Sequence, residues 1–159
     1  MGEDLWMHRS DSTITLEGGA MSVDPAGPTE RENTLDIGAG GTIRGLGTIH
    51  GDIENHGTVL PGSSPGTMTV DGHFIQNDPD ASLVMEIAGL DAYDQLVTDK
   101  CTISDGILGL RFIDGFAPQT GHTFDLISWQ DPSQISFADI NVSGLLAEPE
   151  WTYGWGTSG

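Results

Sequence analysis

The fold is decided by the stretch GTIRGLGTIHGDIENHGTV, residues 41–59. Here and just upstream, apolar β-forming residues occupy odd positions, whereas the even positions are mostly polar. The odd-numbered apolar residues are Leu35, Ile37, Ile43, Ile49, Ile53 and Val59. Strand side chains alternate between two faces with a period of two residues. The shared parity therefore predicts that these side chains all point inward, although glycine turns separate them.

Glycine recurs throughout residues 34–72, and Gly–Thr–apolar triplets begin at Gly41, Gly57 and Gly66. Glycine turns a corner cheaply because it has no Cβ and adopts positive φ. Short strands, tight corners and one inward face predict a β-solenoid, a chain wound in coils around an apolar core. After the turn at residues 61–66 the inward parity changes to even, at Met68, Val70 and Phe74. Leu46 and Leu60 are exceptions to the alternation.

Longer strands are predicted downstream, with turn signals rich in Asp, Pro and Gly between them. The candidates are residues 73–76, 82–88, 94–98, 101–104, 107–113, 123–129 and 135–142. No helix is predicted, so the fold class is all-β.

We divide the chain into four parts. These are an irregular N-terminal segment or incomplete first coil (1–33), the Gly-rich coils (34–72), a region that continues or caps the solenoid (73–145) and a C-terminal tail (146–159). The alternative for the third part is a small antiparallel, sandwich-like cap.

A family resemblance rests on the order of short Gly-rich motifs. In their order along the chain, these motifs resemble the passengers of bacterial autotransporter-like surface proteins. The motifs lie at residues 45–53, 55–62, 64–70, 93–97, 106–110, 115–118 and 121–127. The resemblance covers about residues 34–142. It implies a right-handed parallel β-helix displayed outside the cell, and it brings no catalytic residues. We expect a segment of a longer secreted protein, although residues 1–6 do not read as a signal peptide.

The charge restricts the partners. Lys and Arg number 5 and Asp and Glu 24, for a formal net charge of −19. Such a polyanion repels nucleic acid and anionic membranes. No apolar run is long enough to span a bilayer. The expected partners are surface glycans or proteins of host or neighbouring cells.

Two residues with nucleophilic side chains are interpreted as structural. Ser64 lies in the G-x-S-x-G pattern of residues 62–66, but a nucleophile elbow needs a helix after the serine, and a strand is predicted there. Cys101 is the only cysteine, and its strand-like surroundings indicate a small core residue.

Metal and cofactor sites are not strongly indicated. His50 and His56 share outward parity and, on neighbouring coils, would form a metal pair; solvated surface histidines are the alternative. The acidic pairs Asp78/Asp80, Asp91/Asp94 and Asp99/Asp105 favour turn chemistry, with a loose, weak Ca²⁺ site as the alternative. No cofactor is expected.

The predicted function is non-catalytic: a structural and display element of adhesin type. The first alternative is a carbohydrate-binding β module, for which the ligand-facing aromatic residues would be Trp129, Trp151, Tyr153 and Trp155. The second is a fragment of a β-helix enzyme that acts on polysaccharides. An enzyme of that kind needs a long groove with paired carboxylates, which few coils can provide.

Overall fold

The computed structural model describes residues 12–23 and 33–145, and in this part of the chain every regular element is a β-strand. The all-β prediction is confirmed. The strands are β1 (Thr13–Ser22), β2 (Thr34–Ile37), β3 (Thr42–His50), β4 (Asp52–Asn55), β5 (Thr58–Pro61), β6 (Thr67–Gln76), β7 (Ser82–Gly89), β8 (Ala92–Tyr93), β9 (Gln95–Ile103), β10 (Ile107–Phe112), β11 (Ile127–Trp129), β12 (Gln134–Ile135) and β13 (Asp139–Ser143).

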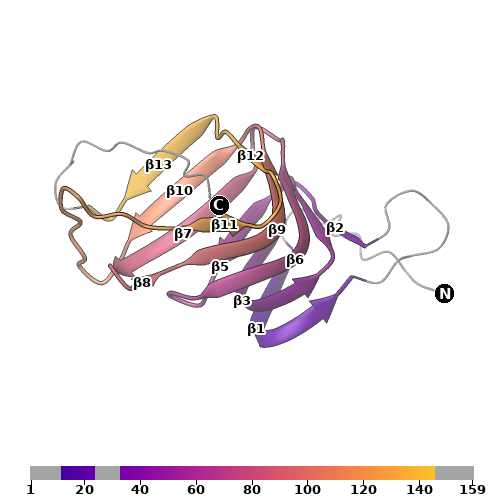
Figure 1. The fold of residues 1–159 in the computed structure, drawn as a ribbon, viewed down its shortest axis with the longest axis horizontal. Helices are drawn as coiled ribbons and strands as arrows, with labels where there is room; N and C mark the ends of the chain where they lie inside the picture. The colour runs from indigo at the N-terminus through magenta and orange to yellow at the C-terminus, as the bar shows by residue number, and fades with distance from the viewer. Residues whose placement is uncertain (1–11, 24–32, 146–159) are drawn as a thin grey trace.

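Nearly all the pairing between these strands is parallel, and it joins them into one large sheet (Figure 1). Within the described residues, the antiparallel exceptions are the short β7–β8 pair and an isolated bridge between Gly45 and Gly62. The late strands β11, β12 and β13 also pair in parallel, with β9, β9 and β10 respectively. Residues 73–145 therefore do not form the antiparallel cap that was the alternative.

The pairing arranges the strands in three parallel stacks. Stack A contains the first half of β1, the first half of β3, and β5, β7, β10 and β13. Stack B contains the second halves of β1 and β3, the first halves of β6 and β9, and β11. Stack C contains β2, β4, the second halves of β6 and β9, and β12. The chain visits the stacks repeatedly in the order A, B, C.

The predicted inward parity is confirmed. All six odd-numbered apolar residues from Leu35 to Val59 are at most 1% exposed, and the even-numbered Met68, Val70 and Phe74 are fully buried. Leu46 and Leu60 are half-buried, which accounts for their place outside the alternation. The change of parity occurs at the corner between β5 and β6, where Gly62 and Ser64 have positive φ.

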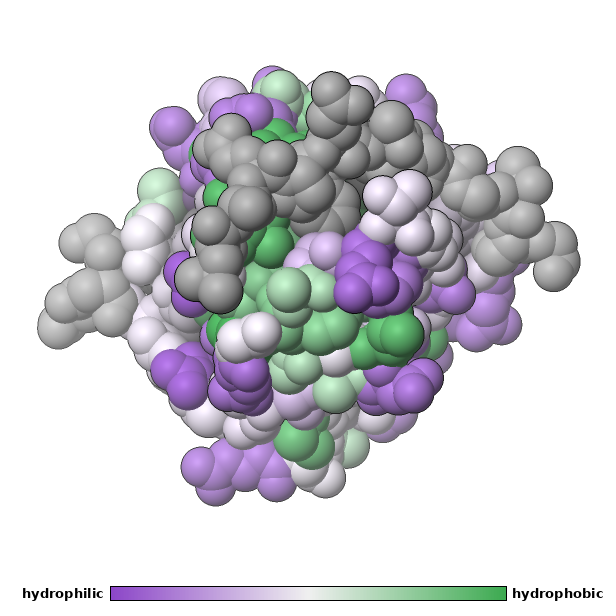
Figure 2. Space-filling model, turned by 90° about the vertical axis from the view of Figure 1, so that its left-hand side faces the viewer, coloured by the Kyte–Doolittle hydropathy of each residue, from purple (hydrophilic) through white to green (hydrophobic). Residues whose placement is uncertain are grey.

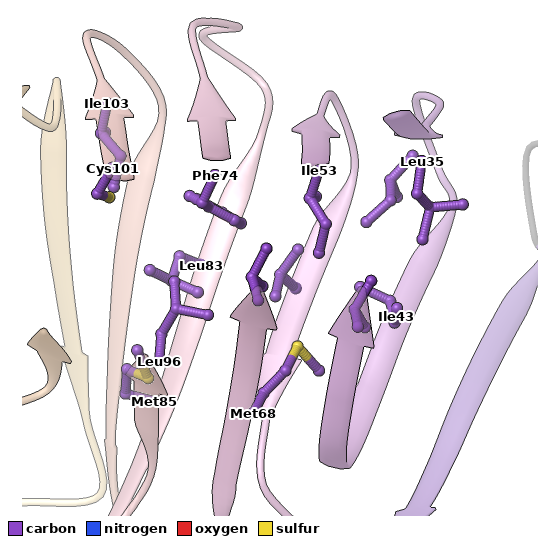
Figure 3. Packing of buried hydrophobic residues seen from close by; sticks show 14 of the residues in the cluster. Leu35, Ile43, Ile53, Met68, Phe74, Leu83, Met85, Leu96, Cys101 and Ile103 are labelled. Atoms are coloured by element: carbon purple, nitrogen blue, oxygen red, sulfur yellow. The ribbon is translucent and has the colours of Figure 1, made fainter. Parts of the chain in front are cut away.

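Strand register aligns the inward residues of successive turns. In stack A the aligned series is Ile14, Ile43, Val59, Leu83, Leu108 and Ile140. In stack C, Leu35, Ile53, Phe74 and Cys101 form the corresponding row, which Figure 3 shows as side chains from successive strands lying beside one another. The core is therefore a column of apolar side chains that runs between the stacks.

Glycine is required where two turns of chain meet most closely. Gly57 lies over the Gly41 carbonyl at the corner between stacks C and A, and a Cβ at position 57 would overlap that oxygen. The Thr58 N–H donates to the same carbonyl at 2.9 Å. Gly45 has φ of 109° and packs on the backbone of Leu16. The close approach that backbone pairing needs leaves no room for a side chain at these two points.

Several predicted boundaries are wrong. β9 is one strand across a corner where two strands, 94–98 and 101–104, were predicted. Only the last three residues of the predicted strand 123–129 are in strand β11, and the predicted strand 135–142 is divided between β12 and β13. In a stacked fold, strands bend from one stack into the next without a turn signal, so local sequence does not mark the boundary.

Candidate functional site

The G-x-S-x-G sequence forms the corner between β5 and β6. Ser64 is exposed, and its hydroxyl donates to Glu86 Oε2 at 2.8 Å. A strand, β6, begins at Thr67 directly after the corner, so the helix of a nucleophile elbow is not there. The hydroxyl is partnered by a carboxylate on the next turn of chain, and the geometry is that of a turn.

Ser64→Ala is expected to leave the fold intact and to lower the free energy of unfolding by less than about 1 kcal/mol, because one exposed hydrogen bond is lost. Chemical denaturation of the variant and the wild type measures the difference. An active-serine probe should label neither protein; labelling that disappears in Ser64→Ala would contradict the turn interpretation.

The histidines are paired with different groups. His50 Nδ1 lies 2.8 Å from Asp71 Oδ2. His56 lies between two other carboxylates, with Nε2 3.3 Å from Glu54 Oε1 and Nδ1 3.2 Å from Asp78 Oδ2. His50 and His56 thus do not form the pair considered from the sequence. Over residues 12–23 and 33–145, no group of three or more His, Cys, Asp or Glu side chains is arranged to hold a metal ion.

Two of the aspartates in the acidic pairs, Asp78 and Asp105, make local turn contacts with the backbone. Asp78 Oδ1 accepts a hydrogen bond from the Asp80 N–H at 2.9 Å, and this bond is the main reason why the pKa of Asp78 is lowered. Asp105 Oδ1 accepts from the Gly106 N–H at 2.8 Å. Such contacts from a side chain to the backbone are what Asp provides in turns. In each of these contacts one carboxylate oxygen accepts a hydrogen bond from a backbone N–H of the same turn.

Asp94 has a different environment, because it is only 2% exposed. Its Oδ1 accepts from the Gly66 N–H at 2.9 Å, and its Oδ2 accepts from the Glu86 N–H at 2.8 Å. Burial raises its pKa to about 6, although the two N–H groups favour the charged form. The carboxylate ties the corner before β6 to strand β7 and satisfies two backbone donors.

Three aspartates lie near one another on the outer side of stack B: Asp71, Asp99 and Asp131. Asp71 lies beside His50 on the neighbouring strand, and Asp99 lies near Asp71 and Asp131. The pKa of Asp99 is raised by loss of solvation and then by the negative charges of these two aspartates. Gln130 Nε2 donates to Asp99 Oδ1 at 3.0 Å. The arrangement is a row of carboxylates along the stack, with their repulsion partly relieved by His50 and Gln130.

Polar side chains also enter the core, in a row that the sequence analysis missed. Asn55 and Gln76 are both fully buried, and Asn55 Nδ2 donates to Gln76 Oε1 at 2.9 Å. Asn55 also donates to the Ser82 carbonyl at 3.1 Å and accepts from the Gly57 N–H at 3.0 Å. The sequence contains a signal for their burial, because Asn55 continues the series of inward residues at odd positions and Gln76 continues the series at even positions.

The thiol of Cys101 is fully buried, and burial raises its pKa to about 12. The prediction that Cys101 is a core residue is confirmed. A thiol in this environment is protonated at neutral pH and is a poor nucleophile.

The aromatic candidates are only partly placed. Trp129 in β11 is half-buried and packs against the apolar core. Trp151, Tyr153 and Trp155 lie outside the described residues. A separate aromatic cluster was not predicted. It surrounds the loop after β10 and consists of Tyr93, Phe112, Phe116, His122 and Phe124, whose rings contact one another. The ring contacts join β8, the end of β10 and the loop that follows β10.

Comparison of the chain with protein-family models, curated proteins and solved structures finds no match to any of them. In the described residues, no helix has the length and apolar character needed to cross a bilayer.

Proposed function

We propose that the chain is a non-catalytic structural and display segment of a secreted bacterial cell-surface protein, of the autotransporter-like, adhesin type. We further propose that the three stacks are the faces of a right-handed β-solenoid. The observation that carries the proposal is the register: the same inward positions recur in parallel strands through five or six levels of each stack.

The mechanical argument follows from that register. Each turn of chain forms backbone hydrogen bonds with the turn before and the turn after, so stiffness along the axis comes from repetition. Each added turn lengthens a stack by about 4.8 Å, the spacing of paired strands. An element built in this way holds whatever it carries at a fixed distance and needs no ligand to fold.

The surface chemistry supports a spacer. Outward positions of stack A carry short polar side chains at Thr13, Thr42, Thr58 and Ser82, which pair in register. Carboxylates follow the outer side of stack B. A net charge of −19 keeps neighbouring copies apart sideways and limits nonspecific adhesion.

Deletion of one turn in register tests the architecture. Thr42 pairs with Thr58, so removal of residues 42–57 joins Gly41 to Thr58 and places β1 against β5, with Leu35 brought next to Phe74. We expect a folded protein that unfolds cooperatively with a lower denaturation midpoint than the wild type. Its far-ultraviolet circular dichroism signal per residue, which reports strand content, should be unchanged.

The control is a deletion of the same length out of register, residues 58–73. It joins the corner after β4 directly to the second half of β6, so the chain passes from stack C to stack C without visiting stacks A and B. It also removes the inward Val59, Met68 and Val70, so we expect loss of the cooperative unfolding transition. If both deletions unfold the protein equally, the repeated-turn architecture is wrong.

Display is tested on cells, with the chain placed between an export leader carrying an epitope and an outer-membrane anchor. The wild type and the in-register deletion should expose the epitope to antibody, whereas the out-of-register deletion should be degraded. Saturable binding of one sugar on a glycan array, or turnover of a polysaccharide, would contradict the non-catalytic spacer and favour the alternatives.

A further inference from the structure

The loop between β11 and β12 contains an Asp–Pro peptide bond, Asp131–Pro132, and both of its residues are exposed. Such a bond breaks more readily than other peptide bonds for two chemical reasons. The aspartate carboxylate can attack the carbonyl carbon of its own residue and close a five-membered ring. The proline nitrogen has no N–H and is more basic than an ordinary amide nitrogen, so it leaves readily. The sequence has two more such bonds, Asp78–Pro79 and, outside the described residues, Asp24–Pro25.

Hydrogen bonds to β9 hold the Asp131–Pro132 bond on both sides. The N–H groups of Gln130 and Asp131 donate to the Asp99 carbonyl at 3.0 and 2.8 Å. Downstream of the bond, β12 pairs in parallel with the end of β9. The bond therefore lies in a short loop that is fixed at both ends on the same strand (Figure 1).

The carbonyl of this bond already has a side-chain donor. Ser133 Oγ donates to the Asp131 carbonyl oxygen at 2.9 Å, and it accepts from the Cys101 N–H at 2.8 Å. Because the Cys101 N–H occupies a lone pair of the hydroxyl oxygen, the hydroxyl hydrogen is directed at the Asp131 carbonyl. A donor fixed at the oxygen where negative charge develops lowers the barrier to attack on a carbonyl.

The nucleophile is not engaged elsewhere. Among the described residues, none donates a hydrogen bond to the Asp131 carboxylate. Its neighbour Asp99 carries the same negative charge and so forms no ion pair with it. The Asp131 side chain is therefore able to turn toward its own carbonyl carbon.

We propose that Asp131–Pro132 is a self-cleaving peptide bond, with the Asp131 carboxylate as the nucleophile and the Ser133 hydroxyl as the donor to the oxyanion. The reaction acts once, on the chain itself, and involves no external substrate. The inference goes beyond the proposed structural and display function and does not depend on it.

The reaction balances with one molecule of water. A carboxylate oxygen of Asp131 forms a bond to the carbonyl carbon of the same residue, and the electron pair of the C=O bond moves to the oxygen that faces Ser133. The C–N bond to Pro132 then breaks, and the proline nitrogen takes a proton from the solvent. The products are a five-membered cyclic anhydride at residue 131 and a free secondary amine at residue 132. Water opens the anhydride to two carboxyl groups, so the net reaction is hydrolysis of one peptide bond.

The bond Asp78–Pro79 provides a comparison within the same chain, because both oxygens of its carboxylate are engaged. Asp78 Oδ1 accepts from the Asp80 N–H at 2.9 Å, and Oδ2 lies 3.2 Å from His56 Nδ1. The Asp78 carbonyl also has a donor, the Ala81 N–H at 3.1 Å. The two bonds therefore differ in the freedom of the nucleophile, and we expect the bond after Asp78 to be the slower one in the folded protein.

The two fragments should stay together after cleavage. β12 still pairs with β9 and β13 with β10, with Ile135 only 9% exposed and Ile140 packed against the core. On the side of the molecule where β13 lies, a group of apolar side chains already reaches the surface among hydrophilic ones (Figure 2). Departure of β13 would enlarge that apolar surface, so cleavage has to be detected under denaturing conditions.

The test follows the full 159-residue chain in mild acid, at about pH 5, which favours protonation of the leaving nitrogen. Samples are denatured at intervals and their fragments are weighed by mass spectrometry. In the folded protein we expect cleavage after Asp131 to be at least about tenfold faster than cleavage after Asp78. In protein unfolded by guanidinium at the same pH the two bonds lose their different surroundings and should break at similar rates.

Variants separate the two roles. Asp131→Glu keeps the charge but needs a six-membered ring, and it should abolish cleavage at this bond. Ser133→Ala should slow cleavage at least about tenfold in the folded protein and not at all in the unfolded one. Ser133→Thr keeps the hydroxyl and should restore the rate. Ser136→Ala, the same change at an exposed serine nearby, is the matched control and should cleave like the wild type.

Thermal midpoints verify that the variants are folded, and three outcomes would overturn the proposal. The first is a folded wild type in which the bond after Asp131 breaks no faster than the bond after Asp78. The second is a ratio of the two rates that is the same in folded and unfolded protein. The third is a folded Ser133→Ala variant that cleaves at the wild-type rate. The deletion and display experiments measure folding and surface exposure, so failure here is distinguishable from failure of the proposed function.

Discussion

Ile49→Asp is expected to unfold the turn that contains β3 and β4, whereas Thr48→Asp at the adjacent position should cost less than about 1 kcal/mol. Ile49 is fully buried in the column of apolar side chains, between Met21 and Val70 on the paired strands. A carboxylate there lacks partners and costs several kcal/mol or becomes protonated. The lost packing of the Ile side chain costs about 2–4 kcal/mol more.

The sum is a large part of the whole stability of a domain of this size, which is typically about 5–15 kcal/mol. Thr48 points the other way, between Ala20 and Thr69 of the paired strands, and its side chain reaches solvent. Its replacement adds one more negative charge to an acidic surface, so salt should reduce even the small cost.

Urea denaturation of the two variants and the wild type measures the contrast, and hydrogen exchange locates it. We expect amides in residues 41–60 to lose protection in Ile49→Asp and to keep it in Thr48→Asp. Similar urea midpoints for Ile49→Asp and Thr48→Asp would mean that a charge is tolerated equally well at the two positions. That result would contradict the assignment of Ile49 to the core and of Thr48 to the surface.

Parity made the core predictable from sequence. The alternation of strand side chains is a local property. The face on which each apolar residue from Leu35 to Val59 lies can therefore be predicted from its neighbours in sequence alone. The same signal indicated the shift to even positions after the rigid turn at 61–66, because Met68, Val70 and Phe74 alternate in their turn. The burial of Cys101 was predicted on another ground, the strand-like sequence around it.

The stacking register was not predictable in this way. The distance along the chain between paired residues in stack A varies: Thr42 pairs with Thr58, Thr58 with Ser82, Ser82 with Ile107, and Ile107 with Asp139. Corners and loops of different lengths absorb the variation, so no fixed repeat marks which residues meet. Contacts between turns, such as Asp94 with Gly66 or Ser64 with Glu86, depend on that register and could not be read from spacing.

The candidate site illustrates the same limit. His50 and His56 were correctly given outward parity, but their partners, Asp71 and Asp78, lie on later turns of the chain. The sequence also gave no reason to separate Asp94 from the other aspartates, because burial of a carboxylate at a corner depends on what the next turn places over it. What the sequence did offer, and what was overlooked, is that a polar residue at an inward position must find its partners inside the core.

Asn55→Leu tests that last point and is expected to lower the free energy of unfolding by about 3–6 kcal/mol, because each unpaired buried polar group costs about 1–3 kcal/mol. The substitution keeps the size of the side chain but removes the acceptor of the Gly57 N–H and the donor to Gln76 Oε1 and the Ser82 carbonyl. Water cannot easily replace it, since Asn55 and Gln76 are both 0% exposed.

The matched control is Asn77→Leu, the same change at an exposed position directly after Gln76, which should cost less than about 1 kcal/mol. The single variant Gln76→Leu and the double variant Asn55→Leu/Gln76→Leu complete the cycle with Asn55→Leu and the wild type. Each single variant leaves the other amide without its partner in the Asn55–Gln76 hydrogen bond, whereas the double variant removes both groups. The double variant should therefore be more stable than the sum of the two single losses predicts. Denaturation midpoints of the four proteins give the coupling free energy. Strictly additive losses of unfolding free energy would mean that the inward amides of Asn55 and Gln76 do not act as a pair. An Asn55→Leu variant as stable as Asn77→Leu would mean that the buried amides contribute nothing to holding one turn of the chain on the next.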